Sequence, residues 1–106
     1  MPIHELTTDN FDQMLSSHGM LVVDFWAEWC GPCRAFGKVM VEAAELYSDV
    51  TFASVNVEIE KELAEEFAVR SIPFVMIIRD RTVVYAESGA LSLPALKDLI
   101  DQAKKL

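Results

Sequence analysis

The run from Met20 to Trp26 places the strongest constraint on the fold, because it is almost continuously apolar. A strand with this pattern is typically buried on both faces, inside a sheet that helices cover on each side. Apolar residues at helical spacing follow between Arg34 and Ser48, and a second strand-like run spans Thr51–Val57. Strands that alternate with helices indicate parallel pairing and right-handed crossovers. This part of the chain therefore predicts an α/β fold.

The rest of the chain completes the order β-α-β-α-β-α-β-β-α. Near the N-terminus, the patterns predict an edge strand at Ile3–Leu6 and then a helix that Thr7 or Thr8 caps. This helix carries Phe11, Met14 and Leu15 and ends at His18-Gly19. Later in the chain, they predict a helix at Glu58–Ala68, antiparallel strands at Phe74–Arg79 and Thr82–Glu87, and a last helix with Ser92 as N-cap. Asp80-Arg81 is a weak turn signal because it lacks glycine. We expect one α/β domain over residues 1–106, with a mixed five-stranded sheet flanked by four helices.

The negative net charge argues against nucleic acid and anionic lipid as binding partners. The chain has 9 Lys and Arg residues against 17 Asp and Glu, a formal net charge of −8. A nucleic-acid-binding protein needs a basic face to neutralise phosphates, and anionic lipid also attracts basic segments. The residues up to Gln13 show no basic segment followed by an apolar one, and Ile72–Ile78 is too short to span a bilayer. We expect a cytoplasmic monomer that binds neither nucleic acid nor membrane.

The only two cysteines, Cys30 and Cys33, lie where the strand-like run gives way to the helix. Only a thiolate attacks a disulfide, and the unpaired N–H groups at a helix N-terminus favour negative charge on sulfur. We expect Cys33 in the first helical turn, as the resolving thiol. We expect Cys30 outside the helix, more exposed, as the nucleophile. Gly31 lets the loop turn tightly, and Pro32 has the φ of a helix start.

Two other interpretations of the cysteine pair stay open. A structural zinc ion needs four ligands, and besides the cysteines the chain offers only His4 and His18, neither at ligand spacing to Cys30. An iron–sulfur cluster held by the cysteines of two chains is a second kind of metal site, and it is favoured less. The pair could also be two ordinary core cysteines, although Gly-Pro would seldom stand between them by chance. We expect no metal ion.

Asp24 and Pro73 are further candidates for the site. Asp24 interrupts the apolar run, and burial of a carboxyl group raises its pKa, so this group could pass a proton to or from Cys33. The alternative is an Asp on a partly wetted face of the strand. Pro73 cannot donate to a strand ladder, which suits the start of the strand that follows. Its peptide bond to Ile72 is open to both isomers, of which trans is the commoner.

These motifs together resemble the thioredoxin family over nearly the whole chain. Val23–Cys33, which contains Trp29-Cys30-Gly31-Pro32-Cys33, is similar to the family's active-site segment, and Arg70–Pro73 and Ser88–Ser92 are similar to two further loops of the family. The resemblance implies a protein-disulfide reductase that carries electrons from a thioredoxin reductase, and ultimately NADPH, to disulfide-containing target proteins. The Cys30–Cys33 disulfide would be its redox group, with no further cofactor.

The resemblance also implies roles for single residues. Pro73 would be cis and would face the dithiol, and Asp24 would be the proton relay. An apolar patch that receives the target backbone would be lined by Trp29, Ile72, Pro73 and Gly89, with Phe74 beside it.

Four positions depart from the family's pattern. Ser54 stands where a lysine usually lies near the buried aspartate, and the loss of that cation would leave Asp24 more easily protonated. Gly37-Lys38 replaces a proline kink, Phe74 replaces a threonine, and Asp80-Arg81-Thr82 replaces a glycine turn. These departures bear on the choice of reductase and of targets.

Two alternative functions remain. Related oxidases and isomerases usually carry a histidine or another dipeptide between the cysteines, whereas Gly31-Pro32 favours a reductant. A non-catalytic binding module would use only the apolar patch, and it would not need both cysteines and Asp24.

Overall fold

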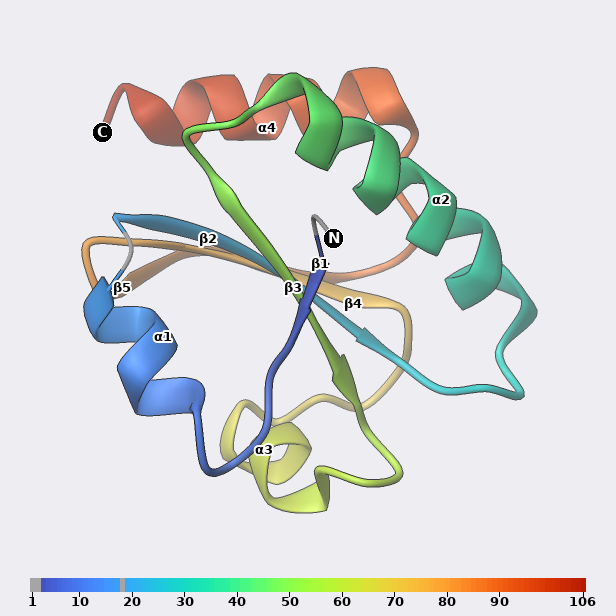
Figure 1. The fold of residues 1–106 in the computed structure, drawn as a ribbon. Coiled ribbons are helices and arrows are strands. Elements are labelled where there is room, and N and C mark those ends of the chain that lie inside the picture. Colours follow the sequence, from blue (N-terminus) through green and yellow to red (C-terminus); the bar gives the residue numbers. More distant parts are fainter. Residues whose placement is uncertain (1–2, 18) are drawn as a thin grey trace.

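The computed structural model describes residues 3–17 and 19–106, and its helices and strands follow the predicted order (Figure 1). The strands are β1 (Ile3–Glu5), β2 (Met20–Trp26), β3 (Thr51–Asn56), β4 (Phe74–Arg79) and β5 (Thr82–Ser88). The helices are α1 (Phe11–Ser17), α2 (Gly31–Leu46), α3 (Lys61–Glu66) and α4 (Leu93–Lys104). Among the described residues, no helix is long and apolar enough to cross a membrane.

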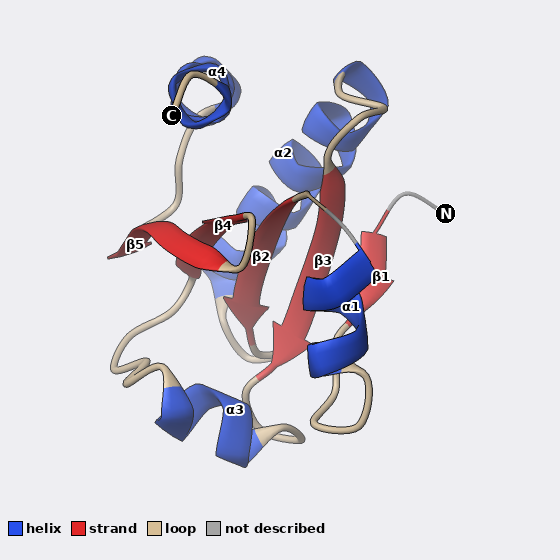
Figure 2. Cartoon of the chain, turned by 90° about the vertical axis from the view of Figure 1, so that its left-hand side faces the viewer, coloured by secondary structure: helices blue, strands red, loops and turns tan. Residues whose placement is uncertain are grey.

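The five strands form one mixed sheet in the order β1-β3-β2-β4-β5. The pairs β1–β3 and β2–β3 are parallel, and the pairs β2–β4 and β4–β5 are antiparallel. Helices α2 and α4 cover one face of the sheet, and α1 and α3 cover the other (Figure 2). The predicted mixed five-stranded sheet with helices on both faces is therefore confirmed.

Strand β2 lies at the centre and gives side chains to a core on each face. Val22 packs with the residues of α2 and α4, whereas Val23 and Phe25 pack in the cluster that contains Phe11 of α1 and Leu63 of α3. Six of the seven residues of β2 are buried, which explains its nearly continuous apolar sequence. Aromatic rings contact one another edge to face in the second cluster, with the Phe25 and Phe74 centroids 5.7 Å apart.

The ends of the helices differ from the predicted ones. Helix α2 begins three residues before Arg34 and runs without interruption through Gly37. Helix α3 is shorter than Glu58–Ala68, because the Asn56 side chain accepts hydrogen bonds from the N–H groups of Glu58 and Ile59 and holds a turn there.

Helix α1 begins at Phe11, after a turn in which the Thr7 hydroxyl accepts a hydrogen bond from the Asn10 N–H at 3.3 Å. The predicted cap at Thr7 or Thr8 therefore belongs to the turn that precedes the helix. The predicted stop at His18-Gly19 involves His18, which lies outside the described residues.

The β4–β5 hairpin closes through Asp80 and Arg81, although neither is glycine. Their φ angles are +51° and +69°, the left-handed region that a two-residue hairpin turn of this type requires at both positions. The Asp80 N–H donates to the Gly19 carbonyl at 2.7 Å, and the Arg81 guanidinium donates to the Ser16 hydroxyl at 2.7 Å. These contacts tie the turn to the chain around α1.

Replacing Arg81 by glycine is expected to raise the free energy of unfolding by about 1 kcal/mol, because glycine adopts positive φ without the steric cost that Arg81 bears. The lost hydrogen bond to Ser16 is exposed and offsets only part of this gain. Urea unfolding would measure the change, and Arg70→Gly, at an exposed position without positive φ, is the control. An equal or lower stability for Arg81→Gly would contradict the argument.

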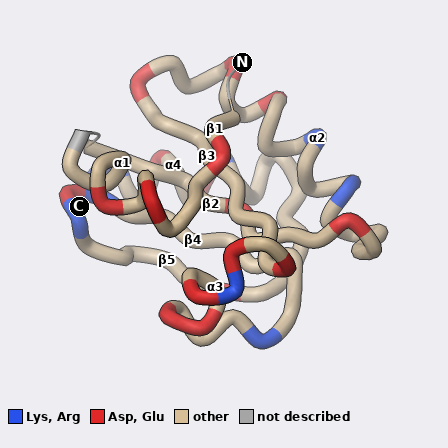
Figure 3. The backbone as a smooth tube through the Cα atoms, turned by 60° about the horizontal axis from the view of Figure 1, so that its bottom comes forward, with Lys and Arg blue, Asp and Glu red and all other residues tan. Residues whose placement is uncertain are grey.

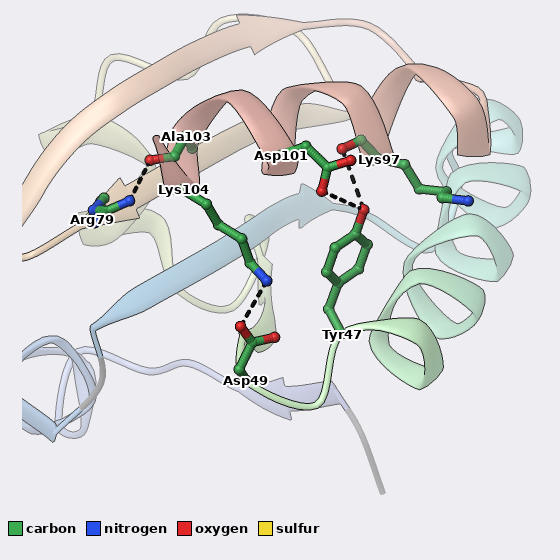
Figure 4. A network of polar contacts seen from close by, with 7 residues as sticks. All are labelled: Tyr47, Asp49, Arg79, Lys97, Asp101, Ala103 and Lys104. Carbon is green, nitrogen blue, oxygen red and sulfur yellow. Dashed lines mark hydrogen bonds and ion pairs between the residues drawn. The ribbon is translucent and has the colours of Figure 1, made fainter. Parts of the chain in front are cut away.

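Helix α4 is fixed at both ends. The Ser92 side chain accepts a hydrogen bond from the Ala95 N–H at 3.3 Å, which confirms the predicted N-cap. Figure 4 shows the contacts nearer its C-terminus. They are Tyr47 Oη to Asp101 Oδ1 at 2.9 Å, Lys104 Nζ to Asp49 Oδ2 at 2.6 Å, and Arg79 to the Ala103 carbonyl at 2.7 Å.

Candidate active site

Cys30 and Cys33 form a disulfide at the N-terminus of α2, with their Cα atoms 5.2 Å apart. Cys30 is the N-cap residue, so it lies just outside the helix, and Cys33 lies in the first turn, as predicted. The Cys30 sulfur accepts a hydrogen bond from the Cys33 N–H at 3.2 Å. One of the unpaired N–H groups of the helix start therefore points at the Cys30 sulfur.

Both sulfurs are shielded in this oxidised state. Cys30 is 5% exposed and Cys33 is 3% exposed, so the expected difference in exposure is small. Trp29 beside them is 66% exposed, and Gly31 and Pro32 are also exposed. The rim of the active-site loop, rather than the disulfide itself, is what an approaching protein meets first.

Two hydrogen bonds hold the active-site loop in place. The Trp29 Nε1–H donates to Glu58 Oε2 at 2.7 Å, across from the turn that precedes α3. The Arg34 guanidinium donates to the Glu28 carbonyl at 2.9 Å and closes the loop on itself. Sequence reasoning missed the role of Glu58, because nothing distinguishes it from the many other acidic residues of the chain.

The loop before β4 lies against the disulfide. The Ile72–Pro73 peptide bond is cis, as the resemblance implies, and the Ile72 carbonyl oxygen lies 3.9 Å from the Cys30 sulfur. The Gly89 N–H donates to the Pro73 carbonyl at 2.8 Å, which brings the loop after β5 to the same place. Gly89 has a φ of +119°, a conformation that other residues rarely adopt.

A cavity of about 370 Å³ opens beside the active-site loop. Among the predicted groove residues, Trp29 and Ile72 line this cavity, and sequence reasoning missed the other residues of its lining. Those are Val57, Val69, Arg70 and Ser71. The ring of Phe74 packs against Phe25 in the core, so its predicted contact with targets remains a prediction.

Asp24 is buried under α2, as the apolar surroundings in the sequence predict. It is 4% exposed, and its Oδ1 has no hydrogen-bond partner among the described residues. Burial raises the pKa of Asp24 to about 7, because water stabilises the carboxylate far better than the protein interior does. The lining of a cavity of about 250 Å³ includes Asp24, Cys33 and Ser54, so the carboxyl group and the Cys33 residue border the same space.

The described residues contain no group of three or more His, Cys, Asp and Glu side chains that could hold a metal ion. Figure 3 shows acidic positions on many parts of the chain, and the few basic positions are scattered among them. The arrangement at the α2 N-terminus is suited to sulfur chemistry, with a titratable carboxyl group behind it.

Comparison with known proteins agrees with this geometry. The thioredoxin family model matches residues 2–102. The chain is 49% identical over 102 residues to "Putative thioredoxin 2" of Streptomyces coelicolor, a match that covers 96% of this chain and 76% of that protein. It is 36% identical to a thioredoxin of Mycoplasmoides gallisepticum, over 92% of this chain and 97% of that protein. A solved mutant thioredoxin from Halobacterium salinarum has the same fold, with a TM-score of 0.88, 30% identity, and coverage of 94% of this chain and 88% of that chain.

Proposed function

Because the chain belongs to the thioredoxin family and is a disulfide reductase with a Cys-x-x-Cys redox pair, we propose that Cys30 is its nucleophile and Cys33 its resolving thiol. The observation that carries this assignment is the hydrogen bond from the Cys33 N–H to the Cys30 sulfur at the helix N-terminus. In the reduced protein, a thiolate on Cys30 would keep this donor and gain from the helix dipole, both of which stabilise negative charge on sulfur.

The reaction proceeds in two steps. The Cys30 thiolate attacks one sulfur of a target disulfide, forms a mixed disulfide and releases the other target sulfur as a thiolate. Cys33 then loses its proton and attacks the Cys30 sulfur. The mixed disulfide breaks, the second target sulfur leaves, and the Cys30–Cys33 disulfide forms. The target gains two electrons and the protein loses two.

Asp24 serves the second step in this proposal. Its carboxylate accepts the Cys33 proton across the shared cavity and thereby makes the resolving sulfur nucleophilic. A carboxyl group whose pKa is about 7 exchanges protons readily at neutral pH, which is the property that a general base needs. When the disulfide is reduced again, Asp24 returns a proton to Cys33.

Membership of the family implies, in general terms, a thioredoxin reductase and disulfide-containing proteins as partners. We place the reaction in the cytoplasm, with electrons that come ultimately from NADPH. Target backbones would bind at Trp29, Ile72, Pro73 and Gly89. Trp29 and Ile72 line one cavity, the Ile72 carbonyl lies against the Cys30 sulfur, and Gly89 is hydrogen-bonded to Pro73.

A measurement of the reduction potential tests whether this chain is a reductant. We expect a value closer to about −270 mV, the known potential of thioredoxin, than to about −120 mV, the potential of a strongly oxidising protein with this kind of site. We also expect NADPH and a thioredoxin reductase to support repeated reduction of insulin disulfides. A potential near the oxidant's value, or oxidation of dithiols in place of disulfide reduction, would show that the chain is an oxidase.

A further inference from the structure

Asp24 is one end of a row of polar residues that crosses the sheet. In the parallel β2–β3 ladder Asp24 is paired with Ser54, and in the parallel β1–β3 ladder Ser54 is paired with Glu5. Paired residues on neighbouring strands point to the same face and have side chains about 5 Å apart. Glu5, Ser54 and Asp24 therefore form a line from the exposed edge strand to the buried carboxyl group.

Ser54 lies between two cavities. The inner cavity, of about 250 Å³, contains Asp24 and Cys33. The outer cavity, of about 260 Å³, contains Glu5 and two other acidic residues, Glu28 and Glu60. Ser54 and Trp26 line both cavities, and Ser54 is half-buried, so Ser54 lies between the two.

We propose that protons pass between solvent and the Asp24 carboxyl group along the row Glu5–Ser54–Asp24, with the Ser54 hydroxyl as the middle donor and acceptor. A hydroxyl group suits this place, because it donates one hydrogen bond and accepts others. Water in the two cavities would complete the chain of hydrogen bonds. This inference rests on the proposed role of Asp24 in proton transfer.

Resolution requires such a path whenever the carboxyl group of Asp24 is already protonated. Because the pKa of Asp24 is about 7, part of the molecules hold this proton at neutral pH, and the carboxyl group must lose it before it can accept the proton of Cys33. The Oδ1 of Asp24 has no partner among the described residues that could take the proton. A route for the proton is offered by the inner cavity and Ser54, which lie next to Asp24. This route leads toward β1, away from the buried disulfide.

The charged and titratable groups around Asp24 agree with the direction of this route. From α2, Cys33 and Arg34 line the inner cavity, and from β4 the residue paired with Asp24 is the apolar Val75. The carboxyl groups that could receive the proton are those of the outer cavity on the β1 side.

A matched pair of substitutions tests the role of the hydroxyl group. Threonine and valine have nearly the same shape, and both suit a strand, but only threonine carries a hydroxyl. In stopped-flow experiments at a pH below the pKa of Asp24, which is about 7, most molecules start with a protonated carboxyl group that must release its proton before resolution. Reduced protein is mixed with a peptide disulfide, and tryptophan fluorescence follows attack and resolution as separate phases. We expect Ser54→Val to slow resolution about tenfold and Ser54→Thr to stay within about twofold of the wild type, with the attack phase unchanged in both.

Glu5 supplies a second, independent readout. Glu5→Gln should slow resolution about threefold in dilute buffer, and concentrated buffer should restore the rate because buffer molecules can take the proton at the exposed end. Glu62→Gln, at an exposed position of α3, is the matched control and should show no dependence of this kind. If Glu5 had only a structural role, the resolution rate of Glu5→Gln would not rise with buffer concentration.

Asp24→Asn separates the two proposals. Slow resolution in Asp24→Asn together with equal rates in Ser54→Val and Ser54→Thr would overturn the path but leave the role of Asp24 intact. Normal resolution in Asp24→Asn would overturn both. Slow resolution in Asp24→Asn and Ser54→Val alone, with buffer rescue of Glu5→Gln, is the result that supports the path.

Discussion

Cys30→Ser is expected to reduce the turnover of insulin disulfides by dithiothreitol to the rate of the chemical reductant alone. A serine hydroxyl is not ionised at neutral pH, and its oxygen does not carry out thiol–disulfide exchange. The remaining thiol, Cys33, is 3% exposed and lies in the first turn of α2, behind the position of Cys30. It is therefore poorly placed to attack a protein disulfide in place of Cys30.

Cys33→Ser is the matched variant, because it removes the other sulfur by the same exchange. It should keep the first attack but accumulate a mixed disulfide through Cys30, which mass spectrometry would detect as a covalent adduct. Peptide mapping then identifies the bonded cysteine. Accumulation of the adduct in Cys30→Ser, and its absence in Cys33→Ser, would reverse the assigned roles.

Asp24→Asn is expected to stabilise the oxidised protein, and to do so more at high pH than at low pH. The pKa of Asp24 is raised from 3.8 to about 7 by burial. Between these two values the folded protein retains a proton that the unfolded chain has lost, so the free energy of unfolding falls as pH rises. One pKa unit corresponds to about 1.4 kcal/mol, which gives a cost of about 4 kcal/mol at pH 8 and about 2 kcal/mol at pH 5.

Asparagine does not titrate, so the pH-dependent part of this cost disappears in the variant. The gain in stability should therefore be about 2 to 3 kcal/mol larger at pH 8 than at pH 5. Guanidinium unfolding of the oxidised proteins at both pH values would measure it. Asp12→Asn, on the exposed surface of α1, controls for the exchange of Asp for Asn itself. The same gain for Asp24→Asn at both pH values would show that burial does not hold its carboxyl group protonated.

Local pattern was sufficient to predict the order of the elements. The apolar run at Met20–Trp26 predicted a buried strand, and this strand is the centre of the sheet. The ends of α3 were not predictable, because they depend on the Asn56 side chain, whose hydrogen bonds hold a turn that periodicity does not reveal. The hairpin turn at Asp80-Arg81 is also held by partners distant in sequence.

The candidate site likewise contains residues that the sequence predicts and residues that only the structure reveals. The two cysteines and the buried Asp24 stand out in the sequence, because a dithiol and a carboxyl group within apolar segments are unusual. Glu58 and Ser54 do not stand out, since an acidic residue and a serine are common on surfaces. Their positions follow from strand register and from the hydrogen bond to Trp29, which only the assembled fold shows.

The central position of β2 affects how the domain unfolds. Its alternate side chains belong to two layers, so removing the helices on one side would leave half of the strand's apolar surface in water. Because both layers pack on this one strand, loss of order on one side should spread to the other. The redox loop follows directly from the end of β2, and its shape should therefore persist until the whole domain melts in one step.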